Sequence, residues 1–280
     1  MSEAIKRYLE LQKALGGNEV ILSGAAGRTQ ESLRGAEGPE AIPTGSPRPS
    51  GPRDDREPPS RPAVQPSSRP GKHWSTDAPP VPTVPGIVVP PLLEAPSPWR
   101  SLEEVAATIA GCRKCFLCQG RTRTVPGEGN AEARLMFVGE GPGQTEDETG
   151  RPFVGRAGEL LTKMIEAIDL ERDQVFIANV VKCRPPQNRK PLPDEIAACS
   201  PYLERQIGLI RPAVLVALGA TAAEAMLGVK RSLTDLRGRV HSYRGIPLVV
   251  TYHPAALLRN PNWKKPTWDD IRIARQLLDR

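Results

Sequence analysis

Three polar side chains stand where predicted strands end. Glu140, Asn179 and His253 each lie at or just after the end of an apolar, β-branched run. A carboxylate can position a water, an amide offers a donor and an acceptor in a fixed fork, and an imidazole can donate a hydrogen bond. Singly, an Asn at a strand end is commonly a turn-former and a lone His a structural residue. Because the carboxyl ends of parallel strands share one edge of a sheet, their convergence predicts an active site there.

The cysteines form a second set. Cys112 and Cys115 make a CxxC pair, and Cys183 and Cys199 follow after 67 and 15 intervening residues. Four thiolates can hold either a [4Fe-4S] cluster or a tetrahedral zinc ion. A separate second CxxC pair, which is typical of zinc sites, is missing, and this favours iron–sulfur. Cys118 is placed like a small apolar residue, and the alternative is a set of buried free cysteines without a metal.

The stretch LMFVGEGPG at 135–143 passes from apolar residues directly into a turn that holds Gly139, Gly141 and Gly143. A short apolar run closed by Gly and Pro is typical of a buried parallel strand that ends in a loop. Glycines leave backbone N–H groups open to a planar or anionic group, so we expect the substrate to bind at this turn. The alternative is an ordinary connection from a strand to a helix.

Strands and helices alternate along the C-terminal part of the chain. The expected strands begin at Leu135 and span 175–181, 213–218 and 246–252, and the expected helices are 101–109, 158–168, 193–210, 221–227 and 268–278. This alternation predicts an α/β fold in which helices cover both faces of a parallel sheet.

The N-terminal third has a different composition. Of the 31 prolines, 18 lie between Pro39 and Pro98, in a segment poor in aromatic and β-branched residues. Such a segment buries too little apolar surface to offset the entropy of ordering it. We therefore predict a short amphipathic helix at 1–17, a Pro-rich disordered linker at 18–98 and a globular domain at 99–280. The helix either docks on a protein partner or folds back on its own domain.

Charge and hydropathy narrow the class of protein. No apolar run approaches the ~18 residues that cross a bilayer, and the N-terminus lacks a signal-peptide core, so we expect no membrane contact and a cytoplasmic location. In a reducing compartment the five cysteines are metal ligands or thiols rather than disulfides. A net charge of +6 is compatible with a polyanionic partner without identifying one. We expect a monomer.

Four motifs, GEGPG, DETGRPFVGRAGELL, NVVKCRPPQNRKP and HPAALLRNP, are similar to those of the family 4 uracil-DNA glycosylases, the iron–sulfur branch of the uracil-DNA glycosylase superfamily. The resemblance runs from about Cys112 to the C-terminus. It implies a three-layer α/β/α fold with a four-stranded parallel sheet. It also implies an enzyme that flips deoxyuridine out of DNA and hydrolyses its N-glycosidic bond, with a [4Fe-4S] cluster held by Cys112, Cys115, Cys183 and Cys199.

The resemblance also implies roles inside the pocket. Phe153 is similar to the family's aromatic residue that stacks on the flipped base. Asn179 would pair with O4 and N3–H of uracil, an arrangement that mismatches cytosine. His253 resembles the histidine that donates a hydrogen bond to uracil O2 as negative charge develops there. Backbone N–H groups from Glu140 to Gly143 would help in the same way.

Two features concern DNA and water. Leu257 and Leu258 resemble the apolar wedge that fills the gap left in the base stack, and Arg259 would contact phosphate. In the best-known branch of the superfamily a water-activating aspartate stands where this chain has Gly141. Glu140 is the nearest carboxylate, and the sequence leaves open whether it positions the water, excludes the thymine methyl group or braces the loop.

The alternatives to an enzyme are a non-catalytic DNA- or polymerase-binding module of the same fold and a zinc-stabilised nucleotide-binding protein.

Overall fold

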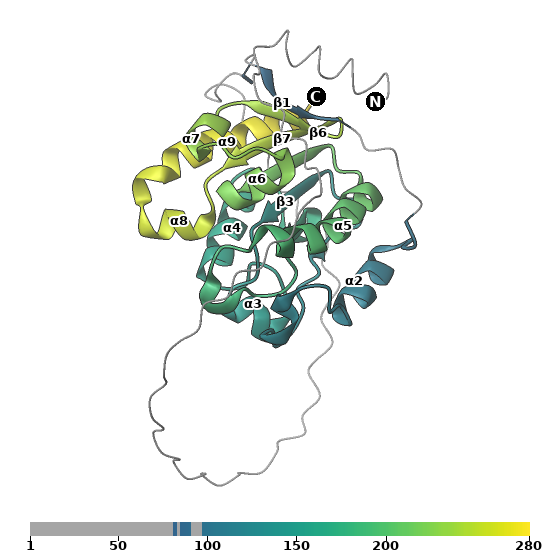
Figure 1. The fold of residues 1–280 in the computed structure, drawn as a ribbon. Coiled ribbons are helices and arrows are strands. Elements are labelled where there is room, and N and C mark those ends of the chain that lie inside the picture. The colour runs from purple at the N-terminus through teal and green to yellow at the C-terminus, as the bar shows by residue number, and fades with distance from the viewer. Residues whose placement is uncertain (1–80, 83–84, 91–96) are drawn as a thin grey trace, which may run out of the picture. The chain divides into compact units, whose positions relative to one another are not determined.

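A seven-stranded mixed sheet organises the protein (Figure 1). The computed structural model describes residues 81–82, 85–90 and 97–280, which lie within the unit Pro66–Arg280. The strand order is β1-β6-β7-β5-β3-β4-β2. The strands are β1 (Pro85–Val89), β2 (Glu128–Gly129), β3 (Leu135–Gly139), β4 (Phe176–Asn179), β5 (Val214–Leu218), β6 (Val240–Tyr243) and β7 (Ile246–Thr251).

The four predicted strands, β3, β4, β5 and β7, form the centre of this sheet and are parallel to one another. The prediction of a purely parallel, four-stranded sheet is nevertheless wrong, because β1, β2 and β6 extend it and two of them pair antiparallel. The sequence pattern did not predict strand β6, because this strand forms by pairing with β7 across a two-residue turn. Arg244 and Gly245 both have positive φ, at 53° and 87°, as a tight hairpin turn of this hand requires.

Strand β1 corrects the predicted extent of the linker, which was expected to reach residue 98. Its residues PGIVV pair in parallel with β6, and the Ile87 backbone N–H donates to Nδ1 of the buried His241 at 2.9 Å. A β-branched run can complete a sheet edge even in a Pro-rich segment, because prolines are tolerated at the ends of edge strands. The predicted helix at 1–17 and the rest of the linker, up to residue 80, lie outside the described residues.

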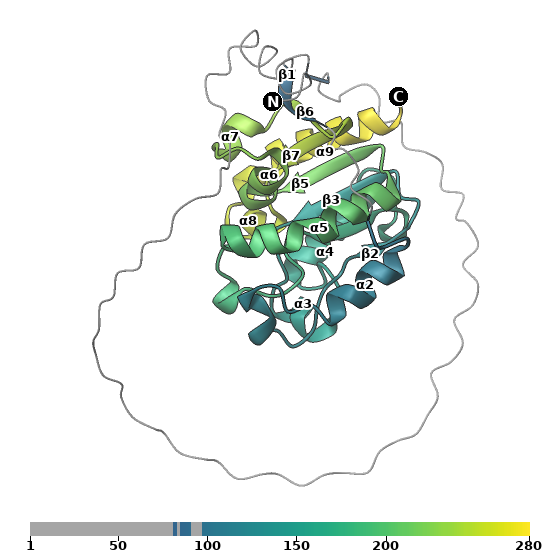
Figure 2. The ribbon, with the colours of Figure 1, turned by 45° about the vertical axis from the view of Figure 1, so that its right-hand side comes forward.

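Helices cover both faces of the sheet, which gives three layers (Figure 2). Helices α2, α5 and α6 pack on one face together with Met136 and Val138 of β3, whereas α4 and α9 pack on the other face with Leu135 and Phe137. This alternation follows from the two-residue period of a strand, whose successive side chains point to opposite faces. The helices are α2 (Leu102–Ala110), α3 (Gln144–Thr149), α4 (Arg156–Glu166), α5 (Pro193–Ile210), α6 (Ala220–Leu227), α7 (Leu233–Leu236), α8 (Pro254–Arg259) and α9 (Lys264–Leu278), with short 3-10 turns η1 (Phe116–Gln119), η2 (Arg172–Gln174), η3 (Pro186–Asn188) and η4 (Pro261–Trp263).

The predicted long helices are present, with shifts at their ends. Helix α5 has the predicted bounds, and Ser101 caps α2 by accepting the Glu104 backbone N–H at 3.3 Å. Helix α9 begins four residues before the predicted Trp268, because Pro266 falls in its first turn, where a missing N–H costs no helical hydrogen bond. Among the described residues, no helix is long and apolar enough to span a membrane.

Candidate active site

A cavity of about 750 Å³ opens at the carboxyl ends of β3, β4, β5 and β7. This volume lies within the range of about 300–1,000 Å³ that is usual for small-molecule sites. The polar residues at the ends of β3, β4 and β7 therefore line one cavity. The sequence-predicted residues on its lining are Glu140, Gly141, Gly143, Phe153, Asn179, His253 and Arg259.

Asn179 ends β4 and is only 1% exposed. Its side-chain Oδ1 is buried and has no hydrogen-bond partner. Gly139, on the neighbouring strand, makes room for it, because a Cβ there would lie 2.4 Å from this Oδ1 and 2.5 Å from the Phe153 ring. An unpaired buried acceptor is costly, so Oδ1 is free to accept a hydrogen bond from a ligand.

A fully buried lysine holds the backbone of Asn179 in place. The Lys182 Nζ donates to the backbone carbonyl of Asn179 at 2.9 Å and to Gln206 Oε1 at 2.7 Å. Gln206 in turn donates to the backbone carbonyl of Pro126 at 2.7 Å. Burial lowers the pKa of Lys182 to about 8. Because this network satisfies the lysine within the interior, it fixes the backbone at the end of β4, from which the Asn179 side chain extends.

His253 is the N-cap of α8, and its Nδ1 accepts the backbone N–H of Ala255 at 3.1 Å. The pKa of His253 is lowered to about 4, mainly by burial and also by the positive charge of Arg259, while the negative charge of Glu146 opposes both effects. The imidazole is therefore neutral near pH 7. With Nδ1 acting as an acceptor, the proton of the neutral ring is assigned to Nε2, which is left as a hydrogen-bond donor.

Phe153 lies against His253, with ring centroids 5.4 Å apart and an angle of 30° between the planes. Its backbone has a φ of 50°, a left-handed conformation that a residue with a side chain rarely adopts. Gly158 permits this conformation, because a Cβ there would lie 1.8 Å from the Phe153 carbonyl oxygen. A strained residue at a cavity must be held by its surroundings, and contacts on both sides of Phe153 do this.

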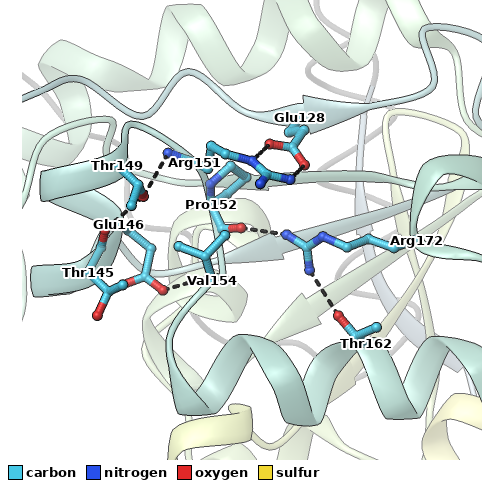
Figure 3. Close-up of polar contacts among 9 residues, drawn as sticks. All are labelled: Glu128, Thr145, Glu146, Thr149, Arg151, Pro152, Val154, Thr162 and Arg172. Carbon is cyan, nitrogen blue, oxygen red and sulfur yellow. Dashed lines mark hydrogen bonds and ion pairs between the residues drawn. The ribbon is translucent and has the colours of Figure 1, made fainter. Parts of the chain in front are cut away.

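Figure 3 shows two of these contacts, from Glu146 to Val154 and from Arg172 to Pro152. On one side, the Glu146 Oε1 accepts the backbone N–H groups of Val154 and Gly155 at 2.9 and 3.0 Å. On the other side, the Arg172 guanidinium donates to the backbone carbonyl of Pro152 at 2.5 Å. The loop that carries Phe153 is thus tied to α3 and to η2.

An ion pair fixes the start of the same loop. Arg151 donates through Nε and Nη2 to both carboxylate oxygens of Glu128, each at 2.7 Å (Figure 3). The hydrogen bond and charge of Arg151 lower the pKa of Glu128. Arg151 is largely exposed, so solvent screens this pair and its main contribution is geometric.

The two glutamates on the cavity differ in their partners. The Glu146 Oε2 accepts the Gly143 backbone N–H at 3.1 Å. This N–H was expected to stabilise the leaving group, but in the structure it is already engaged. The Glu140 carboxylate has no hydrogen-bond or ion-pair partner within the described part of the chain, and it lines the same cavity. Glu146 is therefore a brace, whereas Glu140 is available to a ligand or a water.

The predicted wedge divides into one buried and one exposed residue. Leu257 was predicted to contact DNA as part of the wedge. In the structure it is 2% exposed and packs in the interior, so it is not available to DNA. An α8 only six residues long turns one of two adjacent leucines inward and leaves the other, Leu258, 42% exposed. Arg259 follows it on the rim of the cavity.

All five cysteines, Cys118 included, line one small cavity of about 10 Å³. Its cysteines are Cys112, Cys115, Cys118, Cys183 and Cys199. Arg121 donates to Cys183 Sγ at 3.2 Å, and the backbone N–H of Lys182 donates to Cys199 Sγ at 3.3 Å. No three His, Cys, Asp or Glu side chains in the described ranges are set in the geometry of a bound metal ion. The donor set nevertheless fits a thiolate-bound group, because N–H donors to sulfur stabilise thiolates.

Sequence reasoning missed Glu146 and Lys182. A signal for Glu146 existed, because an acidic residue three positions after a helix N-cap commonly reaches back to the cap N–H, as it does to Gly143. Lys182 carried a weaker signal as a lone charge after the apolar run that precedes Cys183. Its partner Gln206 lies 24 residues away on α5, which the sequence pattern does not reveal.

Comparisons with known proteins agree with this geometry. The family model of the uracil DNA glycosylase superfamily matches residues 126–272. The type-4 uracil-DNA glycosylase of Sulfurisphaera tokodaii is 52% identical over 186 residues, which cover 63% of this chain and 84% of that protein. The type-4 uracil-DNA glycosylase of Thermotoga maritima is 46% identical over 183 residues, covering 64% and 95%. The type-5 uracil-DNA glycosylase of Thermus thermophilus is 36% identical over 151 residues, covering 47% and 68%. The chain belongs to the uracil-DNA glycosylase superfamily and, within it, to the type-4 family.

Proposed function

We propose that this chain is a DNA-repair glycosylase that flips deoxyuridine out of DNA and hydrolyses its N-glycosidic bond, releasing uracil and leaving an abasic site. The observation that carries the proposal is the buried Asn179 amide, whose Oδ1 has no partner and which shares a cavity with the neutral imidazole of His253. Type-4 relatives that are named uracil-DNA glycosylases support the choice of substrate.

Asn179 selects the base in this proposal. Its Oδ1 accepts the N3–H of uracil and its Nδ2 donates to O4, whereas cytosine presents an acceptor at N3 and a donor at N4. Because both groups of the amide are buried, a mismatched base would leave polar atoms unpaired at a cost of ~1–3 kcal/mol each. Phe153 would stack on the plane of the same base.

His253 and Glu140 act on the bond that breaks. Negative charge develops on the departing uracil, and the Nε2–H of His253 donates a hydrogen bond to O2 without adding a buried positive charge. Glu140 is assigned to the attacking water, because the other carboxylate on the cavity, that of Glu146, is engaged by three backbone N–H groups. Leu258 and Arg259 would contact the DNA around the flipped nucleotide.

We further propose that Cys112, Cys115, Cys183 and Cys199 hold a [4Fe-4S] cluster. When bound, this cluster supplies a structural cross-link, because hydrolysis of a glycosidic bond needs no electron transfer. The four residues lie before η1, after β4 and within α5, so the link would tie the start of the domain to the support of Asn179.

The test uses the purified full-length chain and an oligonucleotide with one deoxyuridine, supplied single-stranded and as a duplex. Excision is read as strand cleavage after alkali, with thymidine or deoxycytidine at the same position as matched substrates. We expect cleavage at uracil alone. Asn179→Ala should lower the single-turnover rate by about 10²-fold, the usual cost of losing such a contact. Asn130→Ala, an exposed asparagine away from the cavity, serves as the control.

The alternative of a non-catalytic module makes a different prediction. Such a module would bind uracil-containing DNA with unchanged strands after prolonged incubation, and Asn179→Ala would affect binding alone. Binding without cleavage by the wild-type chain would therefore refute the glycosylase proposal.

A further inference from the structure

Two aromatic rings border the active-site cavity and take no part in the proposed reaction. Tyr252 comes directly before His253, and Trp263 ends η4; both line the cavity. Their ring centroids are 4.6 Å apart and their planes differ by 4°, so the two rings are stacked face to face. This stack lies on the same cavity as the residues that would hold the flipped base.

Arg237 lies against the face of the Tyr252 ring that Trp263 leaves free. Its guanidinium carbon is 4.3 Å from the centroid of the Tyr252 ring, and because Trp263 covers one face of that ring, Arg237 covers the other. The Arg237 Nε donates to Asp270 at 2.7 Å and its Nη2 donates to the Pro266 carbonyl at 2.6 Å. The three-layer stack is therefore built on a fixed base.

Trp263 is fixed in place and still exposed. Its backbone N–H donates to the Asn260 carbonyl at 3.2 Å, and its carbonyl accepts the Thr267 hydroxyl at 2.7 Å. The residue is 37% exposed. Since Tyr252 covers one face of the indole, the exposed surface of Trp263 lies outside that face. Pre-oriented aromatic faces of this kind are what single-stranded nucleic acid sites use to stack bases.

The charge around the stack suits a phosphate backbone. Lys264 and Lys265 follow Trp263 and are exposed, and Arg259 lies on the cavity rim. None of these three cations has an ion-pair partner among the residues that the structure describes. The cavity, at about 750 Å³, is also in the size range of drug-sized ligands and exceeds what one pyrimidine base fills.

We propose that Trp263, backed by Tyr252 and Arg237, is a stacking platform for an unpaired nucleobase next to the flipped deoxyuridine. The inference rests on the proposed function and adds a second base site to it. In duplex DNA the neighbouring base is held inside the helix by its pairing partner and by the base stacked on its far side. The platform is therefore occupied in single-stranded or locally opened DNA, where it strengthens binding.

The test measures binding of the full-length chain to a single-stranded oligonucleotide whose deoxyuridine carries a 2′-fluorine and so resists cleavage. In two further oligonucleotides the 5′ or the 3′ neighbour is replaced by a tetrahydrofuran residue that lacks a base. Wild-type affinity should fall about 5- to 100-fold when the stacking neighbour is removed. Trp263→Leu should lose a similar factor on the intact strand and nothing further on the strand without that base, whereas Trp263→Phe should lose less. On a duplex the three proteins should agree within about threefold.

Two results would overturn the platform. One is an equal loss for Trp263→Leu with and without each neighbouring base, which would mean a purely structural role. The other is a wild-type affinity that stays the same when either neighbouring base is removed. This result would refute the platform even if Trp263→Leu failed to fold. If the wild-type chain excises no uracil, the proposed function fails, and the binding comparison still decides whether the platform exists.

Discussion

Glu146 is predicted to be a positioning residue: it does not contact the substrate, but its removal should lower the excision rate by loosening the active-site loop. It accepts three backbone N–H groups, from Gly143, Val154 and Gly155, at 3.1, 2.9 and 3.0 Å. Hydrogen bonds to a charged group contribute ~1.5–3 kcal/mol each, and neighbouring bonds are not additive. Because Glu146 is partly exposed, we expect Glu146→Ala to lower the free energy of unfolding by about 2–4 kcal/mol.

The same change should slow excision. Without the brace, the loop that holds Phe153 at positive φ is free to relax, and about 2 kcal/mol of lost ordering corresponds to a ~30-fold lower single-turnover rate. The unfolding midpoint should fall by roughly 4–16 °C for a domain of this size. Glu146→Gln should be intermediate, since its carbonyl keeps the bonds to Val154 and Gly155 while its amide opposes the Gly143 N–H.

Glu148 is the matched control for Glu146. It lies on the same helix α3, is exposed, and its carboxylate accepts from Gln144 at 2.9 Å. Both quantities, the excision rate at saturating enzyme and the thermal midpoint, are compared for Glu146→Ala and Glu148→Ala. If the two variants behave alike, the brace does not position Phe153 and the reasoning is wrong.

Three other predictions follow from the buried groups. His253 has a pKa of about 4 in the folded chain against an ordinary 6.5, so the unfolded chain binds more protons in that window; stability should fall by about 3 kcal/mol as the pH drops from 6.5 to 4. Urea unfolding across that range should show a flatter profile for His253→Gln, and an unchanged profile would count against the assignment. Cys183→Ala should abolish the visible absorbance near ~400 nm of the purified protein while Cys118→Ala keeps it, and the opposite pattern would reassign the ligands. Lys182→Met should leave two buried carbonyl oxygens unpaired and lower both the unfolding free energy, by about 2–4 kcal/mol, and the rate of uracil excision; a wild-type rate would show that Asn179 needs no such support.

The meeting of Glu140, Asn179 and His253 in one cavity was predictable, because it follows from the direction of parallel strands and needs no knowledge of side-chain contacts. The loop around Phe153 was not predictable in the same way. Its conformation depends on Glu146 and Arg172, which come from different elements and meet the loop through backbone atoms. Sequence periodicity carries no information about such contacts.

Parts of the sheet were missed for a related reason. Strand β6 has four residues, VHSY, and its alternation is too short to stand out from a loop. Its pairing is set by the turn at Arg244 and Gly245 and by β1, which arrives from a segment that composition assigned to the linker. A monomeric state, a cytoplasmic location, the helix at 1–17 and a protein partner for it stay predictions.

Strand β1 decides where the chain can be shortened. It covers the outer edge of β6, and the Ile87 N–H satisfies the ring of the buried His241. A chain that starts at Pro96 would keep every residue on the active-site cavity and yet expose a row of unpaired backbone groups on β6, which is the kind of edge through which sheets join one another and aggregate. Low recovery of such a truncated protein would therefore reflect self-association rather than loss of catalytic residues, and a start upstream of Gly86 keeps the edge covered.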